Sequence, residues 1–495
     1  MKNLLSTHNR RHLELLEFLV KNNSQWILLK KISEHLNTPI RTVHSDIKEI
    51  NTYITPLSIH TSPSGVKLSI PPNYSERYIY KKILELSHEF NILEFIFMNE
   101  GESIQSLAEK FHISESTTKR IIKKINLILC EEDFSIHTKP LSLLGDEKKI
   151  NQFMSFYFSE RYLFQEEFMT TNQIDLINIL IEKTIHSTEK EMYFPNFKRL
   201  SIRIYLCCIR FKNQHKILID PHRKIRHDIL ANTDFCQRFF EEFGITLDSY
   251  ILNQLFYIFS TSNYAFSVNE LLLISQTDAN LNALYIQTKK VLKKLSILLN
   301  IPLSKKTEDK LLISIINVIS IKDISSHHIF IIYNQKKIFL EELSTNYIYV
   351  RDLVNNYLKE NITLNFSEDE WNELTYILLT HWPDLYYKIR FIEVPIKVFL
   401  LIDTDIEHGQ LIKNELETYC RYLIEVDILK DYSLTELQKL PHDSILVTNI
   451  PNIVKIQCSV LCFGGFLNNS DWKVFIQLLE NILLTRKNTS AYYKS

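Results

Sequence analysis

Two stretches near the N-terminus share one plan, and they constrain the fold more than any other feature of the chain. Residues 26–50 and 102–125 each contain a short amphipathic helical pattern, a tight turn, and a second helical pattern with basic residues on its outer face. This arrangement is typical of a helix-turn-helix, whose second helix enters the major groove of duplex DNA. One copy alone is weak evidence, but two copies favour DNA binding. The alternative, two solvated faces of an ordinary helix bundle, stays open.

Flanking patterns extend each copy into a larger unit. Residues 10–22 carry leucines at helical spacing and predict a supporting helix. Residues 57–70 alternate around a turn that contains Gly65, and residues 134–145 repeat that alternation, so each predicts a β-hairpin, or wing. Residues 76–99 predict one long helix that opens the second unit. We therefore expect two winged helix-turn-helix domains.

The N-terminal part of each second helix supplies the candidate DNA contacts, because those side chains meet bases and phosphates in a helix-turn-helix. Lysine and arginine at i, i+4 spacing give the second copy a dense basic face suited to phosphate neutralisation, and Ser114 is expected to cap its helix. The predicted DNA-binding residues are Arg41, Thr42, His44, Ser45, Lys48, Ser114, Ser116, Thr117, Lys119, Arg120, Lys123 and Lys124.

Composition excludes several other classes of protein. Only 7 of the 495 residues are glycines, which argues against Gly-rich phosphate loops and favours a mainly helical chain. The length of the chain predicts three to five domains. The net charge is −1, so any positive potential must be local. The sequence contains no metal-binding cysteine pair, catalytic triad order or phosphate loop, and no enzyme activity, cofactor or metal is expected. The longest apolar run, residues 311–321, is too short to cross a membrane, which predicts a cytoplasmic protein without membrane contact.

The rest of the chain divides into two parts by its hydrophobic pattern. Residues from about 164 to 392 show helical periodicity and predict two tandem helical domains, with a boundary near residue 283. From residue 393 short apolar strands alternate with helices, which predicts a small parallel α/β domain. The expected domains are therefore 1–72, 73–163, 164–283, 284–392 and 393–495. Four histidines, at or just beyond the ends of apolar helices, are candidate phosphoryl acceptors or simple caps: His215, His327, His328 and His381.

With these pieces in place, the chain resembles the Mga/AtxA group of virulence and carbohydrate-linked transcriptional regulators of Gram-positive bacteria. The resemblance rests on residues 41–48, residues 90–101 and the order of the domains. It implies two winged helix-turn-helix domains, two phosphotransferase-system regulation domains (PRDs) at 164–283 and 284–392, and a C-terminal domain similar to the sugar-transport component enzyme IIB. It also implies a DNA-binding transcriptional regulator that self-associates to a dimer or higher oligomer. Phosphocarrier proteins of the sugar phosphotransferase system would phosphorylate its histidines and tune its activity.

The sequence departs from the usual PRD and enzyme IIB patterns. Arg203 stands seven residues before Arg210, where ordinary members have a histidine, and His381 lies one residue after the usual position, which Thr380 occupies. Asp403 stands where an active enzyme IIB has its phosphorylated cysteine, so we expect the last domain to serve interaction or dimerisation. Two alternatives remain: an RNA-binding antiterminator with PRDs, and a sugar phosphotransferase component.

Overall fold

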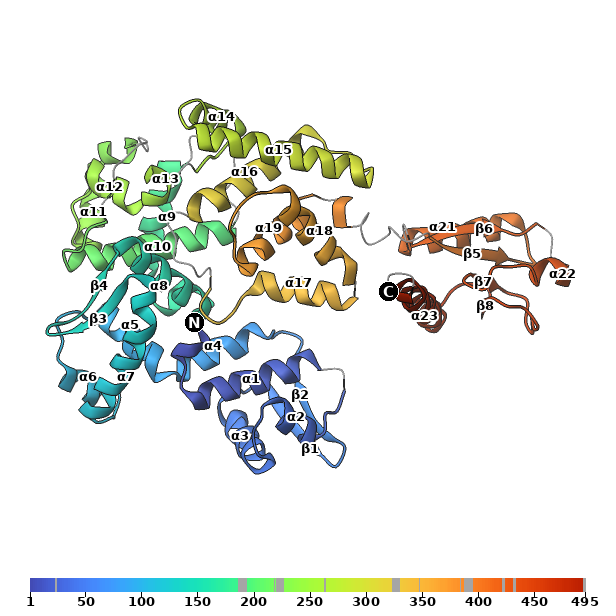
Figure 1. Cartoon of the computed structure of the whole chain (residues 1–495), viewed down its shortest axis with the longest axis horizontal. Helices are drawn as coiled ribbons and strands as arrows, with labels where there is room; N and C mark the ends of the chain where they lie inside the picture. Colours follow the sequence, from blue (N-terminus) through green and yellow to red (C-terminus); the bar gives the residue numbers. More distant parts are fainter. Residues whose placement is uncertain are drawn as a thin grey trace. The chain divides into compact units, whose positions relative to one another are not determined.

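Helices dominate the computed structural model of the chain, and all sheets are small (Figure 1). The structure describes residues 1–22, 25–185, 194–217, 219, 227–261, 264–322, 330–346, 348–382, 384–386, 395–420, 423–430 and 433–492. Two compact units divide the chain. The first contains residues 1–293, 304–342 and 357–377, and the second contains residues 294–303, 343–356 and 378–495.

The first winged domain begins with a helix whose start is set by a serine. Ser6 precedes α1 and its side chain accepts a hydrogen bond from the backbone N–H of Asn9, which satisfies one of the free donors of the first turn. The wing turns at Gly65, whose φ is +126° and where a Cβ would lie 2.3 Å from the carbonyl oxygen of Ile27, so only glycine fits. The elements are η1 (Lys2–Leu4), α1 (Thr7–Lys21), α2 (Leu29–His35), α3 (Ile40–Tyr53), β1 (Ser58–Ser62) and β2 (Gly65–Ser69).

The second winged domain repeats this order, with one correction to the sequence prediction. The expected single helix over residues 76–99 is two helices, because the backbone of Ser87 is extended (ψ 114°) and its hydroxyl accepts from the N–H of Phe90 to start a new helix. Both predicted wings are present as antiparallel hairpins. The elements are α4 (Arg77–Leu86), α5 (His88–Met98), α6 (Ile104–Lys110), α7 (Glu115–Leu129), η2 (Cys130–Glu132), β3 (Phe134–Thr138), β4 (Leu141–Gly145) and α8 (Glu147–Arg161).

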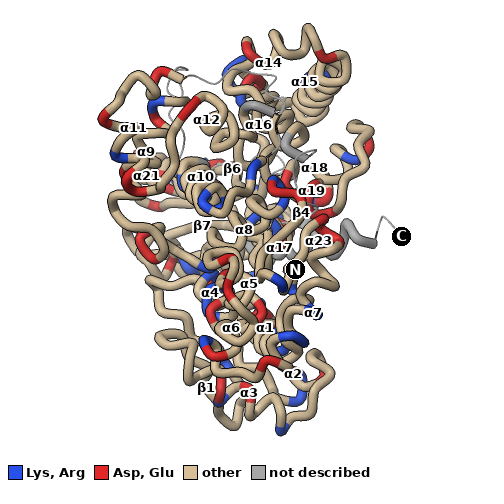
Figure 2. Tube along the Cα trace, turned by 90° about the vertical axis from the view of Figure 1, so that its left-hand side faces the viewer, with Lys and Arg blue, Asp and Glu red and all other residues tan. Residues whose placement is uncertain are grey.

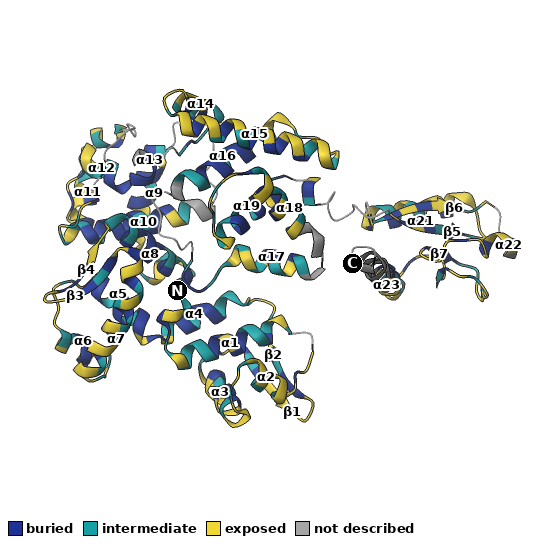
Figure 3. Ribbon diagram, viewed as in Figure 1, coloured by how far each residue is buried: buried dark blue, intermediate teal, exposed yellow. Residues whose placement is uncertain are grey.

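The middle of the chain is helical, as its periodicity predicts. Its elements are η3 (Gln165–Glu167), α9 (Thr171–Ile185), α10 (Phe194–Lys212), η4 (Asp228–Ala231), α11 (Thr233–Phe243), α12 (Ser249–Leu255), α13 (Tyr257–Thr261), α14 (Val268–Ser275), α15 (Ala279–Leu299), α16 (Lys305–Lys322), α17 (Gln335–Asn346), α18 (Ile348–Asn361) and α19 (Glu368–His381). A continuous apolar core runs from Leu4 to Ile332 within the first unit, and it crosses the predicted domain limits at residues 72 and 163 (Figure 3). Both winged domains therefore share their core with the helices that follow them.

The C-terminal residues form a four-stranded parallel sheet in the order β6-β5-β7-β8. Along β5, Val398 and Leu400 belong to one apolar cluster with residues of α21 and α23, and Leu401 belongs to another with Leu437 of α22. The last strand, β8, begins at Ser459, and Lys455 before it has a φ of +65°, which extended backbone does not allow. The elements are β5 (Ile396–Leu401), α21 (Ile406–Tyr419), β6 (Ile424–Ile428), α22 (Leu434–Leu437), β7 (Ile445–Thr448), β8 (Ser459–Cys462) and α23 (Asn469–Tyr492).

Candidate nucleic-acid interface

The second helix of each helix-turn-helix, α3 or α7, is called its recognition helix. The same pair of hydrogen bonds ties each recognition helix to its wing. In α3, the Asn51 amide donates to the carbonyl of Ile59 at 2.9 Å and accepts from its N–H at 2.8 Å. In α7, Asn126 makes the same two bonds with Ile136, at 2.8 and 2.7 Å. Both wings carry the sequence Ser-Ile-His-Thr around this isoleucine. The two units are thus built alike at the level of single side chains, which a chance resemblance of two bundles would not produce.

The first recognition helix, α3, is divided cleanly into two faces. Val43, Ile47 and Ile50 are buried in the core. The predicted contact residues occupy the opposite face: Thr42 is half-buried, and the exposed ones are Arg41, His44, Ser45 and Lys48. Among the predicted residues of this helix, Arg41 and Lys48 carry the permanent positive charges, and the others offer hydrogen-bonding groups.

The second recognition helix, α7, presents more charge. Ser114 caps it, as predicted, by accepting a hydrogen bond from the N–H of Thr117 at 3.1 Å. Thr117 is half-buried, and the exposed residues are Ser114, Ser116, Lys119, Arg120 and Lys123. Lys119 pairs with Glu115 of the preceding turn at 3.1 Å, which offsets part of its charge in the free protein.

Lys124 does not belong to this face, which corrects the sequence prediction. Its half-buried ammonium donates to the carbonyls of Leu4 and Leu5 at 2.9 and 2.7 Å and to Glu89 of α5 at 2.9 Å. All three N–H donors of the lysine thus have partners inside the protein. Lys124 joins α7 to α5 and to the N-terminal segment, and is not available to a phosphate.

The second wing adds an exposed cation that the prediction of contact residues omits. Lys139 lies in the turn between β3 and β4, with Pro140 after it. Its place in the hairpin turn could have been read from the sequence, because the wing itself was predicted. Along the rest of the described chain, basic and acidic residues are interleaved (Figure 2), in keeping with the net charge of −1.

A buried ion cluster joins the second winged domain to α10. The guanidinium of Arg210, 3% exposed, bonds to Glu100, to Glu147 at 2.9 Å and to the carbonyl of Leu143 in β4 at 2.8 Å. His215, just beyond α10, has Nε2 2.6 Å from Glu100 and Nδ1 3.3 Å from Glu147. Burial tends to raise the pKa of Glu100, but the bond from His215 and the charge of Arg210 bring that pKa below its ordinary value. This cluster was missed because Glu100 and Arg210 are 110 residues apart.

The candidate phosphohistidines differ in their surroundings. Both ring nitrogens of His215 face carboxylates, and a phosphoryl group there would meet two negative charges, so this geometry opposes phosphoryl transfer. His381, the last residue of α19, is half-buried, with Nδ1 2.9 Å from the hydroxyl of Thr380. His327 and His328 lie outside the described residues.

The loop after β5 has the structural role expected of a helix cap. Asp405 accepts from the N–H of His408 at 2.7 Å and starts α21, while Asp403 is exposed and exchanges hydrogen bonds with Asn449 beyond β7. Neither aspartate is buried.

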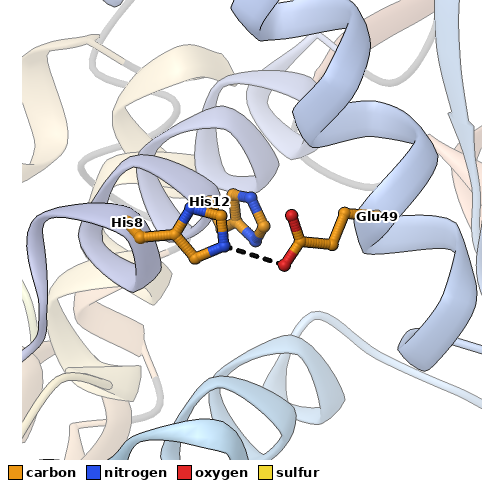
Figure 4. Close-up of side chains that lie close together, drawn as sticks. All are labelled: His8, His12 and Glu49. Atoms are coloured by element: carbon orange, nitrogen blue, oxygen red, sulfur yellow. Dashed lines mark hydrogen bonds and ion pairs between the residues drawn. The ribbon is translucent and has the colours of Figure 1, made fainter.

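A second cluster, also missed from the sequence, links α1 to α3 in the first winged domain. His8 Nε2 lies 2.8 Å from Glu49, and His12 lies against His8 with ring centroids 4.1 Å apart (Figure 4). Arg11 makes two bonds to the buried carboxylate of Asp46, at 2.6 and 2.8 Å. Burial and the neighbouring His8 lower the pKa of His12. His8, His12 and Glu49 could hold a metal ion, since their ligand atoms lie within 4.8 Å of one another.

Within the described part of the chain, every helix is too short or too polar to span a bilayer. Residues 72–158 match the family described as the Mga helix-turn-helix domain. The chain is 25% identical over 499 residues to a protein of Streptococcus pneumoniae whose name describes it as a trans-acting regulator. The aligned region covers 98% of this chain and 99% of that protein.

Two proteins of Bacillus anthracis match shorter parts. The capsule synthesis positive regulator AcpA is 28% identical over 221 residues, 42% of this chain and 43% of AcpA. The anthrax toxin expression trans-acting positive regulator is 28% identical over 149 residues, 29% of this chain and 31% of that protein. With a duplicated winged helix-turn-helix and likeness to a regulator over nearly its whole length, the chain is similar to the Mga/AtxA group of regulators.

Proposed function

We propose that this regulator binds duplex DNA through α3 and α7 together with their wings, and controls transcription near the bound site. The observation that carries the proposal is the duplicated unit in which an asparagine fixes each recognition helix to its wing while the outer face of the helix stays exposed. A helix held in this way can enter the major groove while the wing lies along the backbone.

The two recognition helices are suited to different parts of recognition. On α7, the cations Lys119, Arg120 and Lys123 supply the sequence-independent attraction to phosphates. On α3, Arg41, Thr42 and His44 carry fewer charges and more hydrogen-bonding groups, which suits contacts to base edges. We assign most of the affinity to α7 and more of the sequence preference to α3.

The salt dependence of DNA binding by the full chain tests this assignment. Lys119→Ala combined with Lys123→Ala removes two phosphate contacts, so the slope of log K against log salt should flatten by about 1–2 units on any duplex. Fluorescence anisotropy of labelled duplex DNA over a salt series measures the slope.

The matched control is Lys413→Ala with Lys439→Ala in the C-terminal domain, which changes the net charge equally and should leave the slope unaltered. A slope that stays the same in both double variants would remove α7 from the interface. Preference for single-stranded RNA over duplex DNA would favour the antiterminator alternative.

The proposal extends to control by the remainder of the chain. Histidine phosphorylation by phosphocarrier proteins would change the charge at the end of a helix and thereby alter self-association to a dimer or higher oligomer. Of the described candidates, His381 suits this better than His215, which is held between two carboxylates.

Incubation of the full chain with a purified phosphotransferase relay and labelled phosphoenolpyruvate tests this control. Acid-labile label should appear on the wild type and be lost in His381→Ala, but be retained in His215→Ala. Label that persists undiminished in His381→Ala would exclude His381, and no label on the wild type would exclude relay control.

A further inference from the structure

We propose that the first winged domain binds a divalent transition-metal ion of the Zn²⁺ type through His8, His12 and Glu49. The two histidines lie one turn apart on α1, at i and i+4, and therefore on one face of that helix. Glu49 reaches toward them from α3 (Figure 4). Two imidazoles and one carboxylate, with a fourth position left to water, form a ligand set that Zn²⁺ takes in proteins.

The distances allow ligation with small side-chain movements. The three ligand atoms lie within 4.8 Å of one another, whereas ligands of a tetrahedral Zn²⁺, bound at about 2.0–2.2 Å, lie about 3.4 Å apart. His8 and Glu49 have side chains 44% and 53% exposed, so both can shift by the ångström that is needed and water can reach the fourth position. His12, by contrast, is fixed in the core at 1% exposure.

The surroundings of His12 orient it as a ligand. Its Nε2 lies 3.3 Å from the carboxylate of Asp46, so an Nε2–H donated to that oxygen leaves the Nδ1 lone pair for an ion, which would displace the Tyr53 hydroxyl from its place 3.0 Å away. Asp46 accepts at the ring nitrogen that faces away from the ion, and its two bonds from Arg11 keep the carboxylate in place. A carboxylate that accepts from the second ring N–H of a ligating histidine is the usual second layer of a zinc site.

The second winged domain shows what the same place looks like without a ligand set. Counting from the capping serines, His8 corresponds to Glu89 and His12 to Leu93; counting from the wing-binding asparagines, Glu49 corresponds to Lys124. There, an ion pair between Glu89 and Lys124, whose ammonium also donates to two backbone carbonyls, links α5 to α7 beside an apolar leucine. In the first domain the buried His12 stands in place of that leucine. It adds a third potential ligand, which a pair of oppositely charged side chains does not require.

Occupancy would change the DNA-binding surface directly. Glu49 is adjacent to Lys48 on α3, and its carboxylate lowers the positive potential of this helix. A bound divalent ion reverses that charge and fixes α3 to α1. The first recognition helix would then be both more rigid and more attractive to phosphates when the ion is present.

Metal titration of the full chain, free of DNA, tests the site independently of the proposed function. Chelator-treated protein is titrated with Co²⁺, followed by the visible absorption of tetrahedral cobalt, and then with Zn²⁺ as a competitor. One tight site per chain is expected, with a spectrum of nitrogen and oxygen ligands.

Three variants complete the experiment. His12→Leu introduces the residue that the second domain already uses, and Glu49→Gln keeps the shape of an exposed side chain, so both should fold. Each should weaken the tight site at least about tenfold. His35→Gln, an exposed histidine of the same domain, should leave it unaltered. Absence of a tight site in the wild type, or wild-type affinity in both His12→Leu and Glu49→Gln, would overturn the proposal and leave a histidine–glutamate hydrogen bond.

Discussion

Lys123 and Lys124 are adjacent in the sequence, yet the fold gives them different roles. Lys123 is exposed on the outer face of α7, whereas Lys124 lies about 100° further around the helix and bonds to Glu89 and two backbone carbonyls. Helical spacing had grouped both with the basic face. The distinction depends on α5 and the N-terminal segment packing at that side, which no local pattern of α7 encodes.

Glu100 gives the stability of the first unit a predictable pH dependence. Arg210 and His215 hold its pKa below the ordinary value, so its ionised form stabilises the fold above about pH 4.5, and this contribution is lost as the pH falls through the lowered pKa. Glu100→Gln should reduce the free energy of unfolding by about 2–4 kcal/mol at pH 7, because the buried charge of Arg210 loses a partner. Urea unfolding followed by circular dichroism should show the variant and the wild type converging toward pH 3.

The control for this measurement is Glu115→Gln, whose exposed carboxylate pairs only across one helical turn with Lys119. It should change the free energy of unfolding by less than about 0.5 kcal/mol at either pH. A deficit in Glu100→Gln that stays constant from pH 7 to pH 3 would contradict the assigned role of ionisation.

At the scale of elements, the wing is the part of each domain that a single side chain secures. Asn126→Ala removes two hydrogen bonds to Ile136 and leaves those backbone groups unpaired, which should cost about 1–3 kcal/mol. Hydrogen exchange of the β3–β4 hairpin should accelerate, while α7 itself remains protected. Asn51→Ala should affect the β1–β2 hairpin in the same way.

These two variants serve as controls for each other. Because the domains repeat the interaction, each substitution should loosen its own wing and leave the other unchanged. Accelerated exchange in both wings from one substitution would indicate that the domains unfold together and that the asparagine does not stabilise its own wing alone.

At the scale of the whole molecule, the C-terminal α/β domain is the candidate for self-association. Residues 395–492 contain their own parallel sheet and their own apolar clusters, so their removal need not disturb the core of the first unit. Truncation after residue 393 should lower the oligomeric order of the protein, as measured by light scattering coupled to size exclusion. An unchanged mass would place self-association elsewhere in the chain.

Sequence periodicity predicted most elements of this protein, because helices, hairpins and caps depend on residues close together along the chain. It identified both helix-turn-helix units, both wings, the Ser114 cap, the helical middle and the α/β end. It extended one helix through Ser87, since a serine that ends one helix and starts the next does not break the apolar repeat.

The tertiary structure decided which polar side chains meet. Glu100 and Arg210 are 110 residues apart, His8 and Glu49 are 41 apart, and Lys124 and Leu4 are 120 apart. Each group is unremarkable in its own segment, and its pairing follows from how helices distant in sequence pack against a shared core. The sequence by itself therefore predicted a regulator with two winged helix-turn-helix units. Packing alone determined which cations of those units face outward and which join the domains together.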